Sequence, residues 1–116
     1  MRPFLTCLVP SFKKADGSFA RPVQLQRCLD SLCAAYVPRP YFLQTVVMWD
    51  RVWGGSGVGG MFAQIPDHAS RVDGDYVTVL GDDDVLADET VVGRLQAIAE
   101  SASFPDVIIV STEKAE

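Results

Sequence analysis

Short apolar runs alternate along the chain with stretches in which apolar residues recur at helical spacing. The apolar runs contain few polar residues, which is typical of strands that are buried on both faces of a sheet. They lie at residues 4–9, 42–49, 76–80 and 106–110. The pattern therefore predicts four strands.

In most of the segments between these runs, apolar residues recur at helical spacing. Pro22 can open a helix that continues through residue 35, and Pro38 must lie beyond its end. A second helix is predicted to start at Asp88 as its N-cap and to run past Ile98. A third is predicted over residues 61–72, although Pro66 lies within it. Residues 13–20 form a polar loop, and residues 54–60 form a glycine-rich connection.

Strands that alternate with helices predict an α/β fold with a mostly parallel sheet and helices on both faces. In such sheets, ligands bind beyond the carboxyl ends of the strands. Pro10 and Ser11 follow the first strand, Asp50 follows the second and Asp82 follows the third. We therefore expect these residues to meet at one edge of the sheet.

Composition narrows the class of protein. The chain has 116 residues, 48% of them hydrophobic, and a formal net charge of −5. This length suits a single domain, and the negative charge disfavours nucleic-acid binding. Three cysteines without metal-site spacing indicate a reducing compartment, so a cytoplasmic location is expected. No apolar run approaches the roughly 20 residues of a membrane-spanning helix.

The sequence Gly81-Asp82-Asp83-Asp84 ends the third apolar run with three carboxylates. Like charges at this spacing repel unless a cation neutralises them. If the segment stays extended, Asp82 and Asp84 point one way and Asp83 the other. One or two carboxylates together with substrate phosphates form the usual site for Mg²⁺, and Mn²⁺ accepts the same oxygen ligands. A solvated acidic loop is the simpler alternative.

Several of these stretches, taken in order, resemble a known family. They are residues 8–13 (LVPSFK), 25–32 (LQRCLDSL), 46–50 (VVMWD) and 74–86 (GDYVTVLGDDDVL). The chain resembles the nucleotide-binding half of GT-A glycosyltransferases of the inverting, family-2-like kind, and the resemblance covers most of residues 1–116. It implies a three-layer Rossmann-like fold, a nucleotide-diphosphate sugar as donor, most simply a UDP-sugar, and Mn²⁺ or Mg²⁺ as cofactor.

The resemblance also implies roles for individual residues. Residues 10–12 would contact the base and ribose, and Asp50 would accept a hydrogen bond from the base. Asp82 and Asp84 would form the family's DXD pair and contact ribose and metal, with Asp83 as the other candidate ligand. The residues implied in nucleotide binding are Pro10, Ser11, Phe12, Asp50 and Asp82, and those implied in metal binding are Asp82, Asp83 and Asp84. Apart from the resemblance, Lys13, Lys14 and Arg21 follow the end of the first strand and could meet a diphosphate, although a solvated loop is the simpler interpretation.

Such enzymes also have a second half, which binds the acceptor hydroxyl and supplies the general base. We expect the chain to be truncated or to lack this acceptor half, and no residue is assigned as the base. The alternative is a non-catalytic GT-A-like binding or assembly module, which could self-associate through exposed apolar surface. A phosphoacceptor receiver domain would need an acidic pair after the first strand, and a nucleotidyltransferase would need a glycine-rich basic loop there. Residues 10–17 match both poorly.

Overall fold

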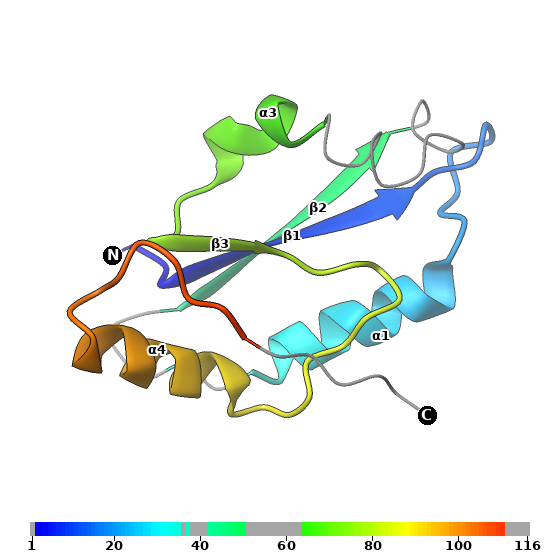
Figure 1. Ribbon diagram of the computed structural model, residues 1–116. Helices are drawn as coiled ribbons and strands as arrows, with labels where there is room; N and C mark the ends of the chain where they lie inside the picture. The colour runs from blue at the N-terminus through cyan, green and yellow to red at the C-terminus, as the bar shows by residue number, and fades with distance from the viewer. Residues whose placement is uncertain (1, 36, 38–41, 51–63, 111–116) are drawn as a thin grey trace.

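The computed structural model describes residues 2–35, 37, 42–50 and 64–110. Within these ranges a small α/β unit alternates strands and helices along the chain (Figure 1). The elements are β1 (Leu5–Phe12), α1 (Pro22–Cys33), β2 (Leu43–Asp50), α3 (Ile65–His68), the short 3-10 helix η1 (Ala69–Arg71), β3 (Tyr76–Val79) and α4 (Val91–Ser101). The glycine-rich connection expected at residues 54–60 lies outside the described residues.

The three strands form a parallel sheet in the order β2-β1-β3. Leu8 of the central strand pairs with Val46 of β2 on one side and with Val79 of β3 on the other. This arrangement confirms the expected parallel α/β sheet and is compatible with a Rossmann-like fold. Because all three strands run in one direction, their carboxyl ends lie along one edge of the sheet.

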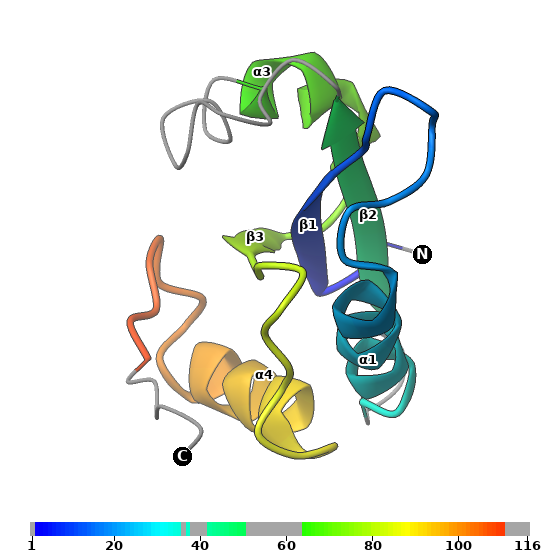
Figure 2. The ribbon, with the colours of Figure 1, turned by 90° about the vertical axis from the view of Figure 1, so that its right-hand side faces the viewer.

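Side chains of β1 alternate between two buried clusters, which explains the unbroken apolar run. Leu5, Cys7 and Val9 pack with residues of α1 and α4, whereas Leu8 packs with Val46 and Met48 of β2. Figure 2 shows α1 and α4 on one side of the sheet and α3 on the other. The central strand is therefore covered on both faces, as its sequence predicts.

Strand β1 continues through Pro10, where the sequence pattern predicted its end. Tyr76 and Leu80 donate main-chain hydrogen bonds to the carbonyls of Phe4 and Leu8, so even-numbered residues of β1 face β3. Strand β3 ends at Val79. The nitrogen of Pro10, which carries no hydrogen, therefore faces the region beyond the end of the β1–β3 hydrogen-bond ladder, where proline is tolerated.

Residues 106–110 were predicted to form a fourth strand, and this prediction is wrong. The segment makes no ladder, and the side chains of Val107 and Ile109 are 71% and 91% exposed. Apolar, β-branched residues favour an extended chain, but a strand also needs a neighbour that accepts its main-chain hydrogen bonds. The segment lies outside the three-stranded sheet.

The helix starts also differ from the sequence prediction. Helix α4 begins at Val91 with Thr90 as N-cap, and Asp88 instead accepts hydrogen bonds from the main-chain N–H and the hydroxyl of Thr90. Pro66 lies in the first turn of α3, where a missing N–H costs nothing, so it starts this short helix rather than interrupting a longer one.

Cys7, Cys28 and Cys33 are all free thiols. No helix in the described part of the chain is long and apolar enough to cross a membrane.

Candidate functional site

The carboxyl ends of β1 and β3 are joined by a buried hydrogen bond. The hydroxyl of Ser11 donates to Oδ2 of Asp82 at 3.0 Å. Both residues are buried, with 1% and 4% of their surface exposed. A carboxylate at such a depth requires partners, because burying an unpaired charge is costly. Two residues that the sequence predicted to share one edge of the sheet are therefore in direct contact.

The chain turns sharply after β3 instead of staying extended. The N–H of Asp84 donates to the carbonyl of Gly81 at 3.0 Å, which closes a turn over residues 81–84. Asp82 points inward to Ser11, whereas Asp83 and Asp84 are exposed. The expected pairing of Asp82 with Asp84 on one side is therefore wrong, because it assumed an extended segment.

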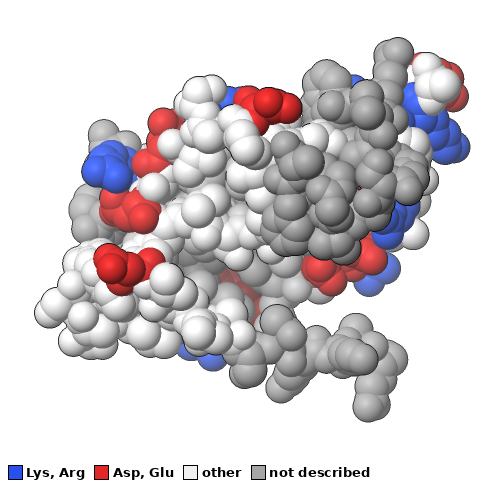
Figure 3. Space-filling model, turned by 45° about the horizontal axis from the view of Figure 1, so that its top comes forward, with Lys and Arg blue, Asp and Glu red and all other residues white. Residues whose placement is uncertain are grey.

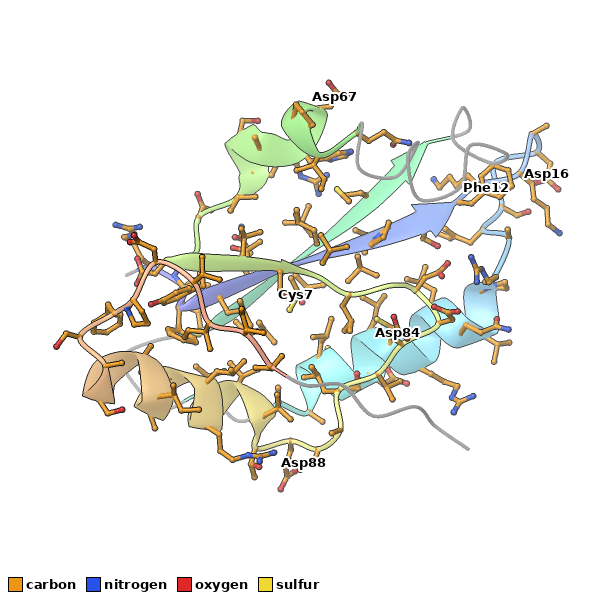
Figure 4. The ribbon with its side chains drawn as sticks, in the orientation of Figure 1. Cys7, Phe12, Asp16, Asp67, Asp84 and Asp88 are labelled. Atoms are coloured by element: carbon orange, nitrogen blue, oxygen red, sulfur yellow. The ribbon has the colours of Figure 1, made fainter. Side chains whose placement is uncertain are left out.

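The exposed carboxylates of this turn converge above Gly81. A Cβ atom at Gly81 would lie 2.8 Å from Oδ2 of Asp84 and 3.1 Å from Oδ1 of Asp83. Glycine thus leaves room for both carboxylates over the main chain. Figure 4 shows Asp84 on the loop that follows β3, above α1.

Arg21 contacts this cluster with its guanidinium. Its Nε lies 3.5 Å from Oδ1 of Asp82, and a terminal nitrogen lies 3.4 Å from Oδ2 of Asp83. The side chain is half exposed, so solvent weakens the two ion pairs. Arg21 precedes Pro22 at the start of α1, and the start of that helix lies at the same edge as the carboxyl end of β1.

Sequence reasoning placed Arg21 near the site but missed its two carboxylate partners. The available signal was its position immediately before a helix that follows the first strand.

Cys28 of α1 lies beneath the acidic turn. The pKa of its thiol is raised to about 11, mainly by burial and, to a smaller extent, by the negative charges of Asp82, Asp84 and Asp83 in that order. The thiol is therefore neutral near pH 7 and serves as a small apolar side chain in the core cluster. The main-chain N–H of Leu86, just after the turn, donates to the hydroxyl of Ser31 on α1 at 3.2 Å, so the segment that follows the turn lies against this helix.

The other residues implied in nucleotide binding lie at the same edge. Pro10 is buried, and Phe12, at the tip of β1, is half-buried (Figure 4). The main chain of Phe12 is paired in register with Asp50, the last residue of β2. Strand register thus brings residues 10–12 next to the end of β2.

The loop that follows β1 is closed by its own contacts. Gly17 has a φ of 88°, which glycine adopts without strain, and its N–H donates to the carbonyl of Lys14. Nζ of Lys13 lies 5.0 Å from the centre of the Phe19 ring. Residues 13–20 thus form a compact hairpin-like loop beside the site rather than a phosphate-binding glycine loop.

The carboxylates of the acidic turn are the candidate metal ligands at this edge of the sheet. Within the described ranges, no three His, Cys, Asp or Glu side chains converge to form a ready metal cage. Asp83 and Asp84 alone bring two carboxylates over Gly81. This arrangement fits a cation that takes one or two protein carboxylates and completes its shell with phosphate oxygens and water.

Comparison with models of protein families, with characterised proteins and with solved structures finds no match to this chain.

Two surface hollows lie away from the acidic turn, one of about 320 Å³ beside Leu32 and Phe42 and one of about 450 Å³ beside Tyr76 and Phe104. Neither of these two hollows is lined by a residue of the acidic turn.

Proposed function

We propose that this chain is the donor-binding unit of a GT-A-type glycosyltransferase with a three-layer Rossmann-like fold. It would bind a nucleotide-diphosphate sugar, most simply a UDP-sugar, at the carboxyl ends of β1, β2 and β3. Transfer of the sugar to an acceptor hydroxyl would complete the reaction. A cytoplasmic location, expected from the cysteine content, belongs to the same proposal.

The hydrogen bond from Ser11 to Asp82 supports this proposal most directly. It fixes the acidic turn against the end of β1, so that Asp83 and Asp84 project from a rigid base. A solvated acidic loop would not need a buried carboxylate with its own hydroxyl donor. Asp82 is thus best assigned to positioning the turn, and the two exposed aspartates are the better candidates for metal ligands.

The proposed roles follow the edge of the sheet. Pro10 and Phe12 would contact the base and ribose, and Asp50 would accept a hydrogen bond from the base. Asp83 and Asp84 would hold Mn²⁺ or Mg²⁺. When bound, such an ion would neutralise charge on the departing diphosphate. The general base for the acceptor hydroxyl is left unassigned.

Charge balance explains why a cation would be needed. Among the ion pairs of the described residues, one guanidinium faces the three carboxylates of the turn, so their combined charge is negative and would repel a diphosphate. A divalent cation between the exposed carboxylates and the phosphates would reverse this repulsion. Nucleotide binding is therefore expected to depend on the metal.

Calorimetry with UDP and with GDP, in the presence and absence of Mn²⁺, tests the proposal. Binding heat is expected only with the metal present, and both Asp83→Asn and Asp84→Asn should weaken it. Asp88→Asn is the matched control, because Asp88 is equally exposed but lies in a separate turn before α4 (Figure 4). The proposal would be wrong if Mn²⁺ made no difference, or if Asp88→Asn had the same effect as the other two variants.

A non-catalytic binding or assembly module is the second candidate. The exposed apolar side chains of Val107 and Ile109 favour it, because they suit contact with another protein surface. Calorimetry with UDP and Mn²⁺ separates the two. Metal-dependent nucleotide binding supports the donor-binding unit, and the absence of nucleotide binding in a folded chain favours the module.

A further inference from the structure

The main chain of Arg21 is held at the edge of the sheet that carries the acidic turn. The N–H of Ala20 donates to the carbonyl of Phe12 at the tip of β1, at 2.9 Å, and the N–H of Leu25 donates to the carbonyl of Arg21, also at 2.9 Å. Pro22, at the first position of α1, restricts the main chain of the residue before it. A movement of Arg21 toward a ligand would therefore be a movement of its side chain.

The side chain of Arg21 is held by long contacts. Ion pairs are common on this surface, and in Figure 3 acidic and basic side chains lie side by side at several places on the face shown. Arg2 lies 2.8 Å from Asp75, and Arg94 lies 3.2 Å from Asp88. The guanidinium of Arg21 instead lies 3.5 Å from one carboxylate of the acidic turn and 3.4 Å from another. Divided contacts of this length are weaker than a short bidentate pair with one carboxylate.

Release of the guanidinium would leave the acidic turn intact. Oδ2 of Asp82 accepts the hydrogen bond from Ser11, so this buried carboxylate keeps one partner when Arg21 moves away. The side chain of Asp83 is 56% exposed, so the ion pair there contributes little beyond the hydration that replaces it. The side chain of Arg21 is itself 52% exposed. Arg21 can therefore exchange partners without a rearrangement of the main chain.

The start of α1 adds to the positive charge at this point. In the described part of the chain, no side chain caps this helix, and its first turn contains no acidic residue. The partial positive charge of the helix N-terminus is therefore not neutralised locally. The guanidinium and the start of α1 together favour an anion, whereas the acidic turn beside them favours a cation. A diphosphate bound through a divalent ion offers both kinds of charge.

We propose that Arg21 is a diphosphate-binding residue that exchanges partners when the ligand binds. In the free chain it pairs with Asp82 and Asp83, and in the loaded chain it donates hydrogen bonds to the phosphate oxygens of the nucleotide. The inference rests on the proposed function, because the ion and the nucleotide are those of that site. A divalent ion neutralises the carboxylates that attract the guanidinium in the free chain, which leaves the diphosphate as its partner.

This exchange predicts opposite effects of one residue on two ligands. Without nucleotide, the positive charge of Arg21 repels a divalent ion from the turn. With the ion already bound, the same charge attracts the diphosphate, and a planar guanidinium can donate two hydrogen bonds to it. Loss of Arg21 should therefore tighten binding of the ion alone and weaken binding of the nucleotide to the ion-loaded chain.

Calorimetry with UDP and with GDP at saturating Mn²⁺ tests the inference. Arg21→Gln should weaken both nucleotides by the same factor, about tenfold, because the diphosphate is common to them and a charge-assisted hydrogen bond is lost. Arg21→Lys keeps the charge and should lose less affinity. Arg94→Gln is the matched control, because Arg94 pairs with Asp88 in the separate turn before α4, and it should bind both nucleotides like the unaltered chain. An equal loss in Arg94→Gln would overturn the inference, because the effect would then come from overall charge.

Nitrogen-15 spectra of the arginine side chains, recorded with diamagnetic Mg²⁺, provide the second measurement. The Nε signal that is missing in Arg21→Gln should shift when Mg²⁺ is added and shift again when UDP is added. If the unaltered chain binds UDP and Arg21→Gln binds it equally well, or if this signal does not respond to UDP, the inference is overturned while the proposed function stands. If the unaltered chain binds no nucleotide with Mn²⁺, the proposed function fails and the inference fails with it.

Discussion

Ser11 and Asp82 are 71 positions apart in sequence, and the hydroxyl of one donates to the buried carboxylate of the other at 3.0 Å. This bond joins the ends of two neighbouring parallel strands. Through this bond Asp82 holds the turn against the end of β1, a structural role that its exposed neighbours Asp83 and Asp84 do not share. The acidic turn therefore divides into one buried anchor and two exposed carboxylates.

Replacing Ser11 by alanine tests this anchor. The change would remove a hydrogen bond to a buried carboxylate, so the free energy of unfolding should fall by about 1–3 kcal/mol. Urea denaturation measures it. Ser18→Ala is the matched control, since the hydroxyl of Ser18 also donates to a carboxylate, that of Asp16, but in an exposed loop. Its effect should stay within about 0.5 kcal/mol. Equal effects of the two changes would mean that Ser11 and Asp82 do not anchor the turn.

Much of the fold could be predicted from local pattern. The strand cores of β1, β2 and β3 and the start of α1 at Pro22 follow from apolar runs and from a proline suited to a first helical turn. These signals are carried by residues close in sequence. The direction of Asp82 could not be predicted in this way, because it is set by Ser11, which only the folded sheet brings near.

The missing fourth strand has a related cause. The sequence of residues 106–110 is strand-like, yet the strand would need a neighbour, and β3 offers its edge without pairing to this segment. Likewise, the contacts of Arg21 with Asp82 and Asp83 depend on how the start of α1 packs beside the turn. Local sequence determines which side chains are present on each strand and helix. The packing of the strands and helices against one another determines which of these side chains come into contact.

Replacement by alanine should change the free energy of unfolding differently at Gly74 and at Gly81. A Cβ at Gly74 would lie 2.7 Å from the main-chain nitrogen of Thr6 and 2.8 Å from the carbonyl of Tyr76, which are fixed by the sheet. Gly74→Ala should therefore lower the free energy of unfolding by at least the roughly 1–3 kcal/mol typical of overpacking. At Gly81 the close atoms are the ends of the Asp83 and Asp84 side chains, which can rotate.

Gly81→Ala should accordingly cost little stability but weaken Mn²⁺ binding, because the two carboxylates would be pushed apart. Thermal unfolding and calorimetry with Mn²⁺ separate the two effects. A Gly74→Ala variant as stable as the unaltered chain would mean that the main chain near Thr6 can move aside. Unchanged Mn²⁺ binding in Gly81→Ala would mean that Mn²⁺ does not bind between the Asp83 and Asp84 carboxylates over Gly81.

Alkaline pH should destabilise the fold through its buried thiols. Burial raises the pKa of Cys7 to about 12, with a smaller contribution from Cys28, and that of Cys28 to about 11, from a reference value of 9.0. Above pH 9.0 the unfolded chain releases thiol protons that the folded chain still holds. The stabilising contribution of these two thiols to the free energy of unfolding is therefore fully present below pH 9.0. It is lost progressively as the pH rises toward 11 and 12.

Urea midpoints measured from neutral to alkaline pH should show this loss. Cys28→Ala should reduce the slope, whereas Cys33→Ser should leave it unchanged, because Cys33 is exposed. A slope that depended on Cys33 but not on Cys28 would contradict the assignment.

Arg21 is expected to compete with a metal ion for the acidic turn. Its guanidinium already lies 3.5 Å from Oδ1 of Asp82 and 3.4 Å from Oδ2 of Asp83, so its positive charge lowers the affinity of the turn for a second cation. Arg21→Gln should therefore tighten Mn²⁺ binding in the absence of nucleotide, which electron paramagnetic resonance of free Mn²⁺ measures directly. Because the side chain is half exposed, the change should alter the free energy of unfolding by no more than about 1 kcal/mol.

The matched control is Arg94→Gln. Arg94 also pairs with an exposed carboxylate, that of Asp88 at 3.2 Å, but at the start of α4. If both variants bound Mn²⁺ more tightly, the effect would come from overall charge rather than from the turn. If neither changed binding, Arg21 would not compete with the ion. If Mn²⁺ bound none of the three proteins, the metal site itself would be absent, which is a separate result from a failure of the competition. Tighter binding in Arg21→Gln alone would show that the guanidinium substitutes for the metal ion when no ligand is bound.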